Sequence, residues 1–326
     1  MTLLEIDDLQ IDFATSAGAL HAVRGASVDI SEGEIIGIVG ESGSGKSVTA
    51  SSVMRLLPGN GVHSGGDIRY RGRSVFSLSA AELRSYRGAE ISMIFQEPGR
   101  SFDPIYSIGK AMAETLRVRN PELSDNEVER RSIELLQEVN IPQPAERLVN
   151  FPHQFSGGLL QRIMIALALA SNPRLLIADE PTTALDVTIQ AGIVDLLLRL
   201  RRERNLAILF ITHNLALISQ IADRIAVMYG GMILEHGTTA DVLRAPRHPY
   251  TRALLDSMLS FGKHYSRDPL QTIKGNVPNP YRPEPGCPFA PRCPLAHAEC
   301  SVALPPLVAE GEPGHAHRCI VAGVKG

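Results

Sequence analysis

The residues of this sequence that could do chemistry begin at residues 40–47, which read GESGSGKS. The pattern G-x-x-x-x-G-K-[ST] is typical of a loop whose backbone N–H groups surround a phosphate, with partial positive charge added by the helix that follows. Lys46 would then reach the terminal phosphates, and Ser47 would offer its hydroxyl to Mg²⁺. The loop residues expected to contact a nucleotide are Gly40, Ser42, Gly43, Gly45, Lys46, Ser47 and Val48.

A glycine-rich turn that merely joins a strand to a helix is the alternative interpretation of this loop. The Lys-Ser ending and the strand-like run EIIGIVG at residues 34–40 favour the phosphate site.

A second candidate site lies at residues 175–180, which read LLIADE. This run predicts a buried strand that delivers two carboxylates to its carboxyl end, where ligands bind in open α/β sheets. Asp179 would hold Mg²⁺ through water, and Glu180 would orient and deprotonate the attacking water. A solvated acidic pair is the alternative, and the phosphate loop in the same chain argues against it.

Short apolar runs alternate with longer helical stretches along the chain. This alternation predicts an α/β fold whose strands and helices could position these residues. The expected strands are residues 34–40, 174–179, 206–212 and 224–230. Antiparallel strands are expected before Glu34 and over residues 67–79, and residues 97–169 should be mainly helical. From about residue 263 onward prolines are frequent, so we expect a domain at residues 1–262 and a loop-built extension at 263–326.

The composition excludes several classes of protein. The chain has 326 residues, 44% of them hydrophobic, and a net charge of −3, which is typical of a globular protein and gives no basic surface for nucleic acid. The start, MTLLEIDDLQIDF, carries acidic residues where a secretory signal would be basic, so we expect a cytoplasmic protein. The longest apolar run, residues 163–170, is shorter than the roughly 20 residues of a membrane helix, so membrane contact would require a partner.

The sequence FSGGLLQR at residues 155–162, followed by LLIADEPTTALD at 175–186, resembles the ATP-binding subunits of ABC transporters. The resemblance implies a P-loop NTPase fold with a mostly parallel core sheet, an antiparallel β subdomain and a helical signature subdomain at about residues 97–169. It also implies an ATPase that uses Mg²⁺.

Further site residues follow from the same resemblance. Gln96 is similar to the Q-loop glutamine that senses magnesium and contacts the membrane subunit. Asp186 lies in the D-loop, and His213 resembles the switch histidine that touches the γ-phosphate. Phe13 is a candidate for stacking on adenine, with an ordinary half-buried strand residue as the alternative.

The signature turn implies that two such subunits act together. Ser156, Gly157 and Gly158 would open a helix whose N–H groups face the γ-phosphate bound on the opposite subunit. ATP would then join the two subunits, and hydrolysis would release them.

A narrower resemblance comes from RAPRHPYTRALLDS at residues 244–257 and the cysteine tail, which look like the longer ATP-binding subunit of dipeptide/oligopeptide and nickel importers. It implies a second, similar ATPase subunit, two transmembrane permease subunits, an external solute-binding protein and a place at the cytoplasmic face of the cell membrane. Dipeptides, longer peptides, nickel chelates and glutathione are all possible solutes.

All four cysteines lie in the tail, with the spacing C-x₅-C-x₆-C-x₁₈-C. A reducing cytoplasm disfavours disulfides, and structural zinc normally uses a C-x₂₋₄-C pair. From spacing alone an iron–sulfur cluster, zinc and unliganded thiols stay open. The family resemblance favours a [4Fe–4S] cluster on Cys287, Cys293, Cys300 and Cys319, for which we expect a structural role.

Two rival functions remain at this stage. One is a soluble ABC protein acting on ribosomes or DNA, which would not fractionate with membranes. The other is an iron–sulfur redox protein with an incidental nucleotide fold, whose activity would survive the change Glu180→Gln.

Overall fold

The four apolar runs predicted as strands are strands in the computed structural model of the chain. They are β3 (Ile35–Val39), β7 (Leu175–Asp179), β8 (Ala207–Thr212) and β9 (Arg224–Tyr229). β3, β7 and β8 are buried along their whole length, which explains why each is apolar without alternation.

The structure describes residues 1–183, 185–257, 273–310 and 314–322. The chain divides into two compact units. The first comprises Met1 and residues 31–34 and 77–209, and the second comprises residues 2–30, 35–76 and 210–326. The expected domain boundary at residues 262 and 263 lies outside the described residues.

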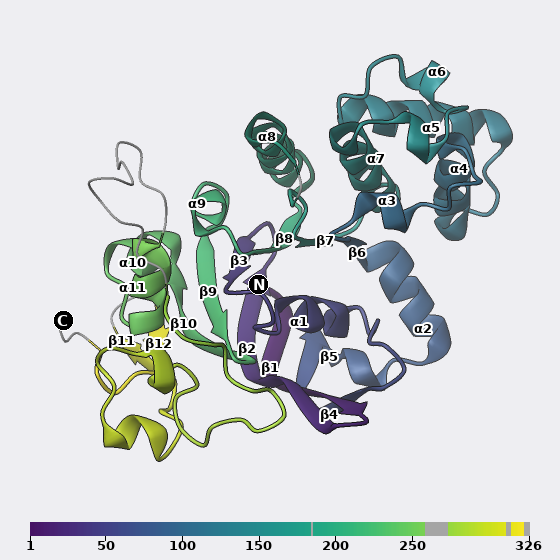
Figure 1. Ribbon diagram of the computed structural model, residues 1–326. Helices are drawn as coiled ribbons and strands as arrows, with labels where there is room; N and C mark the ends of the chain where they lie inside the picture. The colour runs from purple at the N-terminus through teal and green to yellow at the C-terminus, as the bar shows by residue number, and fades with distance from the viewer. Residues whose placement is uncertain (184, 258–272, 311–313, 323–326) are drawn as a thin grey trace. The chain divides into compact units, whose positions relative to one another are not determined.

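The first unit contains a parallel strand pair and the helices expected between residues 97 and 169. β6 (Ile91–Ile94) pairs with β7 in register Ile91 to Leu175, and a π turn (Tyr86–Glu90) leads into it. The helices are α2 (Ala80–Ser85), α3 (Pro98–Ser101), α4 (Ile108–Arg119), α5 (Asp125–Glu138), α6 (Pro144–Arg147), α7 (Gly157–Leu169) and α8 (Val187–Arg204), with a 3₁₀ turn at Pro152–Gln154. α4, α5 and α7 pack on one another, which confirms the helical prediction (Figure 1).

The second unit contains a four-stranded sheet in the order β2-β1-β4-β5. Its strands are β1 (Thr2–Thr15), β2 (Gly18–Ser31), β4 (Gly61–Tyr70) and β5 (Arg73–Ser74). β1 and β4 are antiparallel, as the sequence predicted for this part of the chain.

The other strands of the second unit follow the order β11-β12-β10-β9-β3. β3 and β9 are parallel, whereas β10 (Met232–Thr238) runs antiparallel to β9. The helices of this unit are α1 (Lys46–Val53), α9 (Leu215–Ile218), α10 (Thr239–Arg244) and α11 (Pro249–Asp256), with a 3₁₀ turn at Val75–Ser77. No helix in the described parts of the chain is both long and apolar enough to cross a bilayer.

The extension is not wholly irregular, so the prediction of loops alone is wrong there. β11 (Val308–Glu310) pairs with β12 (His315–His317), and β12 adds to β10 with Glu235 opposite His317 (Figure 1). Two 3₁₀ turns, Ala290–Arg292 and Ala298–Ser301, lie close to the cysteines in sequence. Main-chain pairing to β10 is therefore one of the forces that hold this segment.

Candidate functional site

The predicted phosphate loop runs from the end of β3 to the start of α1. Its last glycine, Gly45, caps α1 with a φ of 103°, a left-handed conformation that side chains disfavour. A Cβ added at Gly40 would lie 2.0 Å from the carbonyl oxygen of Met228, so only glycine fits at this position. The glycines thus let the loop main chain approach neighbouring groups closely, and a loop that surrounds a phosphate needs the same property.

Lys46 is buried and its ammonium group lies inside the loop. Nζ donates to the carbonyl oxygens of Gly40 at 2.8 Å and Glu41 at 2.9 Å. Ser47, the next residue, is exposed in the first turn of α1. A fixed cation and a hydroxyl therefore accompany the backbone N–H groups of the loop.

The acidic pair follows β7 in the other compact unit. Asp179 is buried as the last residue of the strand, and Glu180 adopts a left-handed φ of 47°. One carboxylate oxygen of Glu180 accepts hydrogen bonds from Gln96 Nε2 at 3.0 Å and from Thr183 Oγ1 at 2.7 Å. The structure thus joins Gln96 to Glu180, which the sequence had suggested separately, and adds Thr183, which it had not.

The signature residues begin α7. Ser156 is the N-cap residue, and both Ser156 and Gly157 are exposed. Gly158 is buried, and a Cβ there would lie 2.8 Å from Ile189 Cγ2 of α8. Gly158 therefore has a packing role in this subunit, in addition to the phosphate contact expected of it.

The remaining site residues occupy different local settings. Asp186 caps α8, because its Oδ1 accepts a hydrogen bond from the N–H of Ile189 at 2.9 Å. His213 is exposed directly after β8. Phe13 is half-buried in β1 beside Gly61, where an added Cβ would lie 3.0 Å from its ring.

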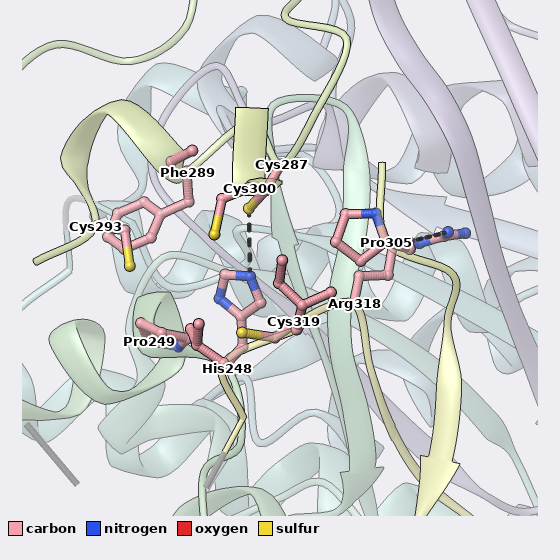
Figure 2. Close-up of a pocket in the computed structure, with 12 residues that line it drawn as sticks. His248, Pro249, Cys287, Phe289, Cys293, Cys300, Pro305, Arg318 and Cys319 are labelled. Atoms are coloured by element: carbon pink, nitrogen blue, oxygen red, sulfur yellow. Dashed lines mark hydrogen bonds between the residues drawn. The ribbon is translucent and has the colours of Figure 1, made fainter. Parts of the chain in front are cut away.

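The four cysteines line one small pocket together with His248 (Figure 2). All four are free thiols, and Cys287 Sγ lies 3.8 Å from His248 Nε2. Cys287 and Cys300 are also joined through the main chain, because the N–H of Cys287 donates to the carbonyl oxygen of Cys300 at 2.8 Å. Cysteines separated by up to 32 residues in sequence (319 − 287) are thus gathered in one place.

Burial, with repulsion from neighbouring cysteines, raises the pKa of Cys287, Cys293 and Cys319. Burial, together with negative charge on the other three cysteines, raises the pKa of Cys319 to about 11. Burial also raises the pKa of Cys287, although backbone N–H groups of Phe289 and Ala290 donate to its sulfur. Such N–H donors stabilise a thiolate, and a bound metal cation would favour the same charged form.

The comparisons with known proteins point to one family. The ABC transporter family profile matches residues 23–183, and the profile of the oligopeptide/dipeptide transporter C-terminal region matches residues 234–300. The dipeptide transport ATP-binding protein DppD of Escherichia coli (strain K12) is 43% identical over 97% of this chain and 97% of its own length. DppD of Bacillus subtilis (strain 168) is 44% identical over 93% of this chain and 90% of its own.

The chain belongs to the ATP-binding subunits of the ABC oligopeptide/dipeptide importer family. A solved structure with the same fold is the dimeric bacterial ABC transporter cassette MJ0796, with a TM-score of 0.65 and 25% identity over 72% of this chain and 98% of that chain. The expected P-loop NTPase fold is confirmed, as is the expectation of an ABC-type ATPase.

The residues of this ABC ATPase fit ATP and Mg²⁺. The loop offers a backbone cradle and the ammonium group of Lys46, which suit a polyphosphate. Ser47 in one compact unit, and Gln96 and Asp179 in the other, each carry oxygen atoms of the kind that Mg²⁺ prefers. Bound Mg²⁺ would neutralise charge on the phosphate oxygens, and bound ATP would supply the γ-phosphoryl group.

The four cysteines share one pocket but, in the part of the chain that the structure describes, do not form a site for a metal ion. Among the described residues, no three His, Cys, Asp or Glu side chains come close enough to hold one metal ion. Cys287 and Cys300 are buried, Cys293 and Cys319 are partly exposed, and all four are donors of the type that iron–sulfur clusters use.

Two residues next to the phosphate loop were not singled out from the sequence. Tyr250 Oη accepts a hydrogen bond from the N–H of Glu41 at 2.9 Å, and Arg292 forms an ion pair with the Glu41 carboxylate at 2.6 Å. Tyr250 belongs to the RAPRHPYTR segment, which sequence analysis used only as a family marker.

Proposed function

We propose that this chain is the ATP-hydrolysing subunit of an importer that takes up dipeptides or oligopeptides across the cytoplasmic membrane. The observation that supports hydrolysis most directly is the Glu180 carboxylate, held by Gln96 and Thr183 beside the strand-ending Asp179. A peptide solute is supported by relatives over 40% identical, which are named dipeptide or oligopeptide transport ATP-binding proteins.

Each residue would have one role in the reaction. Lys46 binds the β- and γ-phosphates, Ser47 and Asp179 hold Mg²⁺, and Glu180 takes a proton from the attacking water. His213 contacts the γ-phosphate, and Phe13 stacks on adenine. Ser156, Gly157 and Gly158 would contact the ATP bound on the partner ATPase, with Asp186 at the same interface.

The proposed assembly has a second, similar ATP-binding subunit, two transmembrane permease subunits and an external solute-binding protein. The chain would then sit at the cytoplasmic face of the membrane, with Gln96 as its link to a permease. Residues 1–262 would form the ATPase domain and residues 263–326 the extension.

Growth on peptides tests the proposal. A strain lacking this chain should fail to grow on defined dipeptides or oligopeptides as sole nitrogen source, and the intact chain should restore growth. The change Glu180→Gln should abolish this rescue while leaving ATP binding intact. Rescue by the Glu180→Gln variant, or unimpaired peptide use without the chain, would refute the proposal.

We also propose that Cys287, Cys293, Cys300 and Cys319 bind a [4Fe–4S] cluster with a structural role. Their common pocket and the backbone N–H groups that donate to the sulfurs of Cys287, Cys293 and Cys319 support this. Anaerobically purified protein should contain iron and sulfide and show a broad absorption shoulder near about 400 nm. Stoichiometric zinc without that shoulder would show that the cysteines bind zinc and not a cluster.

A further inference from the structure

The second residue of the phosphate loop is held by the cysteine-rich extension. Arg292 Nη1 donates to Glu41 Oε2 at 2.6 Å, and Arg292 Nη2 donates to Glu41 Oε1 at 3.1 Å. Two parallel bonds of this kind fix both the position and the plane of a carboxylate. The residues are 251 positions apart in sequence.

Arg292 is itself immobilised by the extension. Its side chain is only 5% exposed, and its nitrogens also donate to the carbonyl oxygens of Lys274 and Ile273 and to the hydroxyl of Tyr229. Arg292 directly precedes Cys293, one of the four pocket cysteines. The position of the Glu41 carboxylate therefore depends on where the segment next to Cys293 holds the Arg292 guanidinium group.

An aromatic cluster forms a second connection between the same two regions. Phe289, between Cys287 and Cys293, packs on Tyr250 and Tyr229 with ring centroids 5.2 and 5.5 Å apart. Tyr250 accepts the hydrogen bond from the Glu41 backbone. The main chain and the side chain of Glu41 thus depend on groups that contact the extension.

Charge gives this arrangement a direct consequence for binding. Glu41 places a carboxylate on a loop whose ligand is a polyanion, and an uncompensated negative charge there would repel the phosphates. Arg292 is the buried cation that offsets it. We propose that Arg292 is a positioning residue of the phosphate loop, which neutralises and fixes Glu41, so that the extension sets the affinity of the loop for nucleotide.

This inference rests on the proposed ATP site and is tested by steady-state kinetics on the purified chain with its partner ATPase. Arg292→Gln should raise the KM for Mg-ATP about tenfold and change kcat less than about twofold, because the charge is lost from the binding loop and not from the reacting groups. Glu41→Gln should not raise KM. The double variant should return KM to the value of Glu41→Gln.

The rescue separates positioning from a general structural role. If Arg292 only stabilised the extension, removing the Glu41 charge would not restore KM. An unchanged KM in Arg292→Gln, or a double variant as impaired as that single variant, would overturn the proposal. The matched control is Arg24→Gln, which removes a different arginine bond to the extension, from Arg24 Nη2 to the carbonyl oxygen of Glu284, and should keep the original KM.

Arg292→Lys serves if Arg292→Gln does not fold. Lysine keeps the positive charge but cannot form the bidentate hydrogen bonds to Glu41, so the KM for Mg-ATP should rise about threefold. Adding Glu41→Gln should cancel that rise. A Lys variant with the original KM would overturn the proposal. Failure of the unaltered chain to bind Mg-ATP would instead refute the proposed function, so the two failures are distinguishable.

Discussion

At the scale of single residues, Glu180 combines a costly backbone conformation with a well-supported side chain. A non-glycine residue in the left-handed region costs on the order of 1–3 kcal/mol, which neighbouring contacts must offset. Hydrogen bonds from Gln96 and Thr183 to the same carboxylate oxygen can do so. The strained backbone then serves to aim the carboxylate.

We predict that Thr183→Val lowers kcat for ATP hydrolysis about tenfold while leaving the KM for ATP nearly unchanged. A hydrogen bond to a charged group contributes about 1.5–3 kcal/mol, and its loss would let Glu180, the proposed general base, leave its position. Phosphate release at saturating Mg-ATP measures the effect. Thr183→Ser, which keeps the hydroxyl, is the control, and equal losses in both variants would contradict the argument.

The proposed ATP-site residues could be singled out from the sequence because their signals are local. Lys46 and Glu180 each lie within a short motif whose strand and loop context is visible in sequence. The role of Thr183 was not predicted, since a threonine in a turn has many uses. The contact between Arg292 and Glu41 joins residues 251 positions apart, and no pattern in one sequence signals such a pair.

At the scale of elements, a buried hydrogen bond between side chains joins the extension to β10. Glu235 is fully buried and accepts hydrogen bonds from His315 Nε2 at 2.6 Å and from the N–H groups of Arg247 and His248. Burial alone would raise the pKa of Glu235, but these bonds outweigh it and the pKa is lowered. β12 escaped prediction because three residues, HAH, carry no periodic signal.

We predict that His315→Ala detaches β12 from β10. Losing a hydrogen bond to a buried charged group costs about 1.5–3 kcal/mol, although Glu235 keeps its bonds from the N–H groups of Arg247 and His248. Hydrogen exchange should show faster exchange in β12, and chemical denaturation should show the loss of stability. His297→Ala, which removes an exposed histidine 4.0 Å from Glu299, is the control and should change stability little. Unchanged exchange in β12 would contradict the prediction.

We predict that His236, which follows Glu235 in β10, makes the protein less stable in mild acid. Burial, with the positive charge of Arg224 next, lowers the pKa of His236 below its ordinary value of 6.5. Between the folded-state pKa and 6.5 the unfolded chain therefore binds more protons, so stability falls as the pH falls below about 6.5. Thermal unfolding from pH 7.5 to 5.5 measures this. His236→Gln should make the dependence on pH shallower, and an equally steep dependence would contradict the assignment.

At the scale of the whole molecule, the signature end of α7 bears on association with a partner. Ser156 and Gly157 are exposed at the start of a helix of 13 residues, where N–H groups and the helix dipole favour an anion. In the proposed dimer that anion is the γ-phosphate bound to the other ATPase. Nucleotide would then contribute to the interface itself, and the dimer would depend on ATP.

ATP-dependent association is therefore the last prediction. The Glu180→Gln variant, mixed with the second ATP-binding subunit of the importer, should sediment as a dimer with Mg-ATP and as monomers with Mg-ADP, because only ATP offers a γ-phosphate to both subunits. Adding Ser156→Arg should prevent the dimer while the phosphate loop still binds ATP, since a bulky side chain then fills the helix start. Ser124→Arg, at the exposed N-cap of α5, makes the same change at another helix and should leave association intact. A monomer that hydrolyses ATP at the full rate would contradict the shared site.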